Sequence, residues 1–75
     1  MALIDKWEKE ERNIKIQGPA ATKYSVSDVQ GEKLFQISMY GSENRKEKGS
    51  ASQTVQLNKK SAMELIIILM KEFSL

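Results

Sequence analysis

The sequence contains neither cysteine nor histidine. Without cysteine no disulfide can stabilise the fold, although a domain of 75 residues buries only about 60% of the surface of its unfolded chain. The missing thiolates and imidazoles are also the usual ligands of zinc, iron and copper, and the commonest nucleophile and general base of enzymes. We therefore expect no metal, no cofactor and no enzymatic activity.

Long apolar segments and nucleotide-binding motifs are missing as well. The longest apolar run, Leu65 to Met70, has six residues, whereas a membrane-spanning helix needs about 17. The start of the chain lacks the basic and apolar regions of a signal peptide. We therefore expect a cytoplasmic or nucleoid-associated protein that does not associate with a membrane. None of the four glycines belongs to a phosphate-binding loop motif.

The net charge of the whole chain is small, but charge is distributed unevenly along the sequence. The formal net charge is +2, yet residues 42–60 alone sum to +3 and residues 1–12 sum to −1. The positive charge is therefore local. A basic segment of this kind is a candidate contact for an anionic partner.

The hydrophobic pattern predicts a single domain over residues 1–75 of the α+β class. We expect a four-stranded antiparallel sheet followed by one C-terminal helix. The expected segments are an arm or short helix over 1–11, strands over 12–17, 23–29, 32–40 and 53–57 with a flexible loop over 42–52, and a helix over 58–74.

The clearest local signal is a hairpin that turns at Gln30-Gly31, because glycine in a two-residue loop suits a primed turn. This turn sets Val26 opposite Phe35 and Tyr24 opposite Ile37, so that apolar side chains share one face. The other face is expected to be polar. Its predicted members are Lys23, Ser25, Ser27, Gln36, Ser38, Tyr40, Thr54 and Gln56, with Val29 and Leu34 near the turn.

The predicted helix starts at Asn58 or at Ser61, both of which can act as caps. One apolar stripe, Ala62, Leu65, Ile66, Leu69 and Phe73, is expected to cover the sheet. A second stripe, formed by Met63, Ile67 and Met70, has no assigned partner. Either the N-terminal segment with Leu3, Ile4 and Trp7 covers it, or two chains form a homodimer through it.

The polar face is a candidate surface for single-stranded nucleic acid. Small hydroxyls and amides leave room for a ligand, the flat ring of Tyr40 can stack on a base, and cations can follow a phosphate backbone. The residues predicted to bind are Lys15, Lys23, Lys33, Gln36, Tyr40, Arg45, Lys46, Lys48 and Gln56. The same alternation is also typical of a sheet with one solvated face and no ligand.

The segment from Lys23 to Phe73 resembles the positive-cofactor-four family of transcriptional coactivators and its bacterial and phage relatives. The resemblance lies in the Gly31 turn, the strand Lys33–Ile37, the Lys48-Gly49 loop, the strand Val55–Leu57 before Asn58, and Leu65 and Leu69 of the helix. Two features depart from the family pattern: five residues separate Gly49 from Val55, and Ala62 and Met63 stand where an aromatic residue is frequent. The resemblance implies a homodimer that binds single-stranded DNA across a curved sheet.

Two other readings stay open. The first is a small phage-type or mobile-element-type module that binds a host or self protein through Met63, Ile67 and Met70 or through a strand edge, since methionine-rich stripes adapt to varied partners. The second is a structural subunit of a larger assembly. Nucleic-acid binding separates the main prediction from both.

Overall fold

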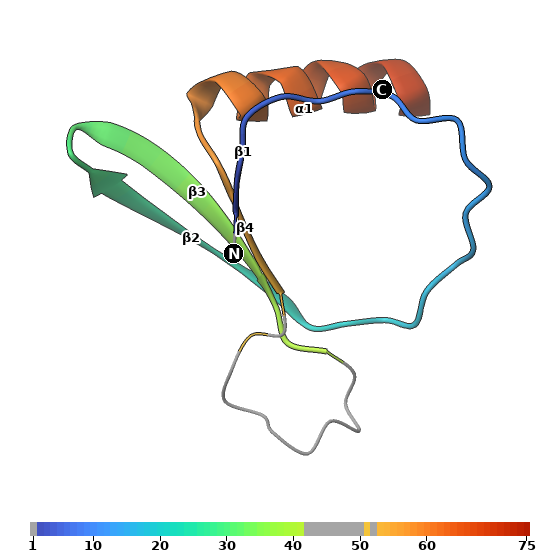
Figure 1. The fold of residues 1–75 in the computed structure, drawn as a ribbon, viewed down its shortest axis with the longest axis horizontal. Helices are drawn as coiled ribbons and strands as arrows, with labels where there is room; N and C mark the ends of the chain where they lie inside the picture. Colours follow the sequence, from blue (N-terminus) through green and yellow to red (C-terminus); the bar gives the residue numbers. More distant parts are fainter. Residues whose placement is uncertain (1, 42–50, 52) are drawn as a thin grey trace.

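The computed structural model describes residues 2–41, 51 and 53–75. Its elements are strands β1 (Ala2–Ile4), β2 (Thr22–Val29), β3 (Glu32–Met39) and β4 (Gln53–Leu57), followed by helix α1 (Lys59–Phe73) (Figure 1). The predicted α+β layout of four strands and one C-terminal helix is confirmed. No helix in the described part of the chain is long and apolar enough to span a membrane.

The hairpin of β2 and β3 follows the predicted register. Val26 pairs with Phe35, Tyr24 with Ile37 and Asp28 with Lys33. At the turn, Gln30 and Gly31 have φ angles of 53° and 81°, the two positive values that a type I′ turn requires. The separation of an apolar face from a polar face is therefore confirmed for this hairpin.

The first strand differs from the prediction. The strand expected over 12–17 does not form, and Ile14 and Ile16 are 86% and 100% exposed. Instead, Ala2–Ile4 pairs with β4 in parallel, so the strand order is β1-β4-β3-β2 and the sheet is mixed rather than fully antiparallel. Alternation alone does not make a strand, because a strand needs a neighbour for its backbone groups. β1 pairs with β4, and residues 12–17 pair with no strand of the described sheet.

The short helix considered for residues 1–11 is likewise absent. Leu3 and Ile4 belong to β1, and residues 5–21 contain neither helix nor strand. The helical spacing of Leu3, Ile4 and Trp7 covers hardly more than one turn, and nucleating an isolated helical turn is unfavourable. Residues 5–9 form an arm beside α1 (Figure 1). Trp7 Nε1 donates a hydrogen bond to the Ser61 carbonyl at 3.0 Å, and Lys9 lies 3.0 Å from Glu72.

Helix α1 begins directly after β4. Asn58 is the N-cap, and its side chain accepts a hydrogen bond from the Ser61 backbone N–H at 2.9 Å. Ser61 is not the cap itself. Its hydroxyl accepts from the Asn58 N–H and completes a capping box. Only Asn58 separates the strand from the helix, so the direction of β4 and this cap together set the direction of α1.

The helix does not cover the sheet as the sequence predicted. It packs chiefly against β4, while Ile66, Leu69 and Phe73 are 55%, 39% and 69% exposed. In the described part of the chain, Leu57 is the one buried hydrophobic residue. The prediction was wrong because periodicity shows which helical face is apolar, not which surface lies against it.

Candidate functional site

The candidate site is the polar face of the sheet, built by strand alternation. Side chains at every second position point to the same face, and the register sets Ser25 opposite Gln36 and Gln36 opposite Gln56. Ser38 lies between Lys23 and Thr54 in the next row. The predicted polar face therefore exists across β2, β3 and β4.

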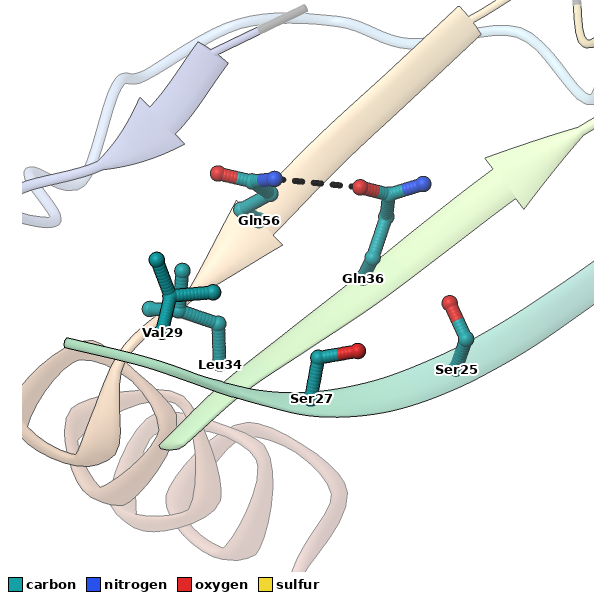
Figure 2. Close-up of a pocket in the computed structure, with 6 residues that line it drawn as sticks. All are labelled: Ser25, Ser27, Val29, Leu34, Gln36 and Gln56. Carbon is teal, nitrogen blue, oxygen red and sulfur yellow. Dashed lines mark hydrogen bonds between the residues drawn. The ribbon is translucent and has the colours of Figure 1, made fainter. Parts of the chain in front are cut away.

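A chain of hydrogen bonds runs across this face. Gln56 Nε2 donates to Gln36 Oε1 at 3.0 Å, and Gln36 Nε2 donates to the Ser38 hydroxyl at 3.4 Å. Figure 2 shows the first of these bonds between the amides of β4 and β3. These bonds orient both amides, and the Gln56 side-chain carbonyl oxygen is the acceptor at the end of this series of hydrogen bonds.

Beside the two amides lies a shallow hollow of about 240 Å³. It is lined by Ser25, Ser27, Val29, Leu34, Gln36 and Gln56 (Figure 2). One end is apolar, formed by Val29 and Leu34, and the other carries the glutamine amides. The volume lies below the roughly 300 Å³ at which pockets for small-molecule cofactors begin. The hollow is therefore small for a whole cofactor.

Tyr40 and Lys23 stand together further along the same face. Lys23 Nζ lies 5.2 Å from the centroid of the Tyr40 ring, within the range of a cation–π contact. The Tyr40 backbone N–H donates to the Ala21 carbonyl at 2.9 Å, which fixes the residue beside the start of β2. The aromatic ring and the cation are thus held together as one unit.

The structure brings four of the predicted binding residues together: Lys23, Gln36, Tyr40 and Gln56. Lys33 is not among them, because it pairs with Asp28 and alternates with Leu34, which places it on the apolar face. Lys15 is exposed in the segment between β1 and β2. The remaining three, Arg45, Lys46 and Lys48, lie outside the described residues.

Charge on the polar face is small. Lys23 contributes the cation, and Glu32, opposite Val29 on the same face, contributes an anion near the turn. The described part of the face is therefore nearly neutral. A polyanion bound here would depend for its electrostatic attraction on Lys23 and on the basic segment that follows Gly41.

Two residues at the apolar end of the hollow, Val29 and Leu34, were not among the predicted binding residues. Alternation had already assigned them to the polar face, so the signal was present in the sequence. Their apolar character directed attention to packing instead. In the structure Val29 is 48% exposed, and it forms part of the wall of the hollow.

The predicted dimer stripe lies away from the polar face on α1. Met63, Ile67 and Met70 are 54%, 63% and 51% exposed. The N-terminal arm was the alternative cover for this stripe, and it leaves all three residues about half exposed. No described residue therefore buries the stripe.

The described residues contain no group of three or more carboxylates that could hold a metal ion. Comparisons with protein-family models, curated proteins and solved structures find no match. The resemblance to the positive-cofactor-four family therefore stays a prediction from the sequence.

Proposed function

We propose that this protein binds single-stranded nucleic acid, without catalysis and inside the cell, as a homodimer that presents the polar face of its sheet. The observation that carries this proposal is the combination on one face of a small hollow, two hydrogen-bonded amides and an aromatic ring with its cation. Stacking surfaces beside a cationic path are the general requirements for binding single strands.

Each part of the face has a role in this proposal. A base enters the hollow, where Val29 and Leu34 contact its flat surface. The Gln56 and Gln36 amides exchange hydrogen bonds with its edge, and Gln56 offers its carbonyl oxygen as an acceptor. A duplex would keep this edge paired and stacked, so the hollow favours unpaired bases.

Tyr40 provides a second stacking platform for a neighbouring base. Lys23 lies over the ring, so a base that stacks on Tyr40 takes the place of the ammonium group, which then meets a phosphate. The predicted phosphate contacts beyond the sheet are Lys15, Arg45, Lys46 and Lys48. They supply the charge that the described part of the face lacks.

The test is a fluorescence-anisotropy titration with labelled oligo-thymidine, oligo-uridine and a duplex, each at about 50 mM and about 200 mM salt. We expect binding of the single strands in preference to the duplex, and weaker binding at the higher salt because bound cations release counterions. Absence of binding at the lower salt, or affinity that does not change with salt, would contradict the proposal.

The exposed stripe of Met63, Ile67 and Met70 favours a second candidate, a module that binds another protein through α1. Flexible methionine side chains fit varied apolar partners. A chain that is monomeric, ignores nucleic acid and binds a defined amphipathic peptide would favour this candidate over the first.

A further inference from the structure

Two apolar surfaces of this protein lie open in the single chain. On the sheet, Tyr24 and Val26 of β2 are 72% and 50% exposed, and the Tyr24 ring stacks on Phe35 with centroids 5.1 Å apart. On α1, exposed apolar side chains point in several directions: Met63, Ile66, Ile67, Ile68, Leu69, Met70 and Phe73. A helix that is apolar around most of its circumference is normally buried.

The single chain exposes more surface than a compact monomer of its size. Its accessible surface is 7025 Å², compared with about 4,700 Å² expected for a folded monomer of 8.5 kDa. Its radius of gyration is 14.5 Å, compared with about 11 Å expected for a compact domain of this length. The exposed segment 10–21 and the two apolar surfaces both contribute to this excess.

The protein cannot close these surfaces on each other within one chain. Asn58 alone joins β4 to α1, and its capping box with Ser61 holds the first turn of the helix. The hydrogen bond from Trp7 to the Ser61 carbonyl and the ion pair of Lys9 with Glu72 hold the N-terminal arm along the helix. α1 is thus held at the β4 side of the sheet (Figure 1), whereas Tyr24 and Val26 lie on β2 at the opposite edge.

A second copy of the same chain satisfies both surfaces at once. In a twofold dimer each chain offers the same two surfaces, so the helix of one can lie on the sheet of the other and the reverse contact follows by symmetry. Pairing of the helices alone would leave Tyr24 and Val26 in water. The excess surface of about 2,300 Å² per chain is an upper limit on the area that a dimer buries, because segment 10–21 also contributes to it. Obligate dimers bury about 1,000 Å² or more per chain.

We infer that two chains associate by reciprocal exchange, with α1 of each chain lying on the apolar sheet face of its partner around Tyr24 and Val26. The inference rests on the homodimer of the proposed function and specifies its interface. The polar face, which carries the nucleic-acid proposal, stays free on the outside of both sheets.

Disulfide trapping tests the contact between helix and sheet. Because the chain has no native cysteine, two single substitutions report one contact. We would co-express a Val26→Cys chain with an Ile67→Cys chain that carries a longer tag, purify the full-length proteins, oxidise them, and separate the products on a non-reducing gel. A disulfide forms only where the two Cα atoms come within about 7 Å.

The inference expects a mixed disulfide between the two chains. Ser25→Cys is the matched control, since it is the neighbouring residue on the same exposed strand but points to the opposite face. It should give no mixed product with Ile67→Cys. A disulfide only between two Ile67→Cys chains, an equal yield with the Ser25 control, or no mixed product would overturn the inference.

Light scattering of the unmodified protein without nucleic acid completes the test. A mass of twice 8.5 kDa is expected, and a monomer would overturn the exchange. The two proposals fail separately. A monomer that binds oligo-thymidine leaves nucleic-acid binding intact, and a trapped dimer that ignores every oligonucleotide leaves the interface intact.

Discussion

Trp7 donates its indole N–H to the backbone carbonyl oxygen of Ser61, 3.0 Å away and 54 positions later in the chain. The bond joins the N-terminal arm to the first turn of α1, next to the capping box of Asn58. Ser61 is fully buried, so this contact lies at the best-enclosed point of the described structure. A residue in an arm without regular structure thus helps to fix the helix.

Substituting Trp7→Phe should lower the free energy of unfolding by about 1 kcal/mol, because it removes one hydrogen bond and keeps an aromatic ring. Trp7→Ala should cost more, since the packing of the half-buried ring is lost too. Urea unfolding at a fixed protein concentration measures both. If Trp7→Phe unfolds like the unmodified protein, the ring alone holds the arm.

Gly31 and Gly18 form a matched pair for the turn. A Cβ added at either position would meet no heavy atom within 4 Å, but only Gly31 has a positive φ, 81°. Gly31→Ala should therefore destabilise the protein by about 1 kcal/mol through backbone strain. Gly18→Ala should be neutral or slightly stabilising. Equal effects in thermal unfolding would show that the turn conformation is not needed.

Gln56 and Gln53 lie on the same strand but point to opposite faces, which separates binding from strand stability. Gln56→Ala should weaken binding of oligo-thymidine about fivefold to tenfold, the equivalent of one lost hydrogen bond of about 1 kcal/mol. Gln53→Ala should leave the affinity unchanged. The anisotropy titration measures both variants, and equal losses would argue against recognition by the polar face.

Tyr40 should contribute stacking to the binding of single strands. Tyr40→Ala should reduce the affinity by about 1 to 3 kcal/mol, the usual cost of losing one base-stacking side chain. Tyr40→Phe keeps the ring and should retain most of the affinity. Circular dichroism checks that both variants fold. Unchanged affinity in a folded Tyr40→Ala protein would remove this residue from the site.

The hairpin and the helix could be predicted because their signals are local. Gln30-Gly31 fixed the register of eight residue pairs, and with it the face on which Gln36 and Ser25 lie. Asn58 marked the start of the helix through its capping chemistry. Turn and cap residues act on their immediate neighbours, so one sequence is enough to read them.

The rest depended on contacts between distant segments. Ala2–Ile4 is a strand only because β4 offers an edge, and three residues carry no period of their own. Ile14 and Ile16 alternate correctly but find no partner. The same limit applies to the site, where alternation placed Val29 and Leu34 on the polar face but could not show that they close one end of a hollow.

Successive residues at the end of strand β4 contribute to the polar face, to the buried side of the sheet and to the start of the helix. Gln56 is hydrogen-bonded to Gln36 on the polar face, Leu57 is buried on the other side, and Asn58 is the N-cap of the helix. A ligand that displaces β4 therefore displaces α1 as well. If two chains associate through α1, a ligand bound to β4 changes the affinity of one chain for the other. By thermodynamic linkage, association of the chains then changes the affinity for the ligand by the same factor.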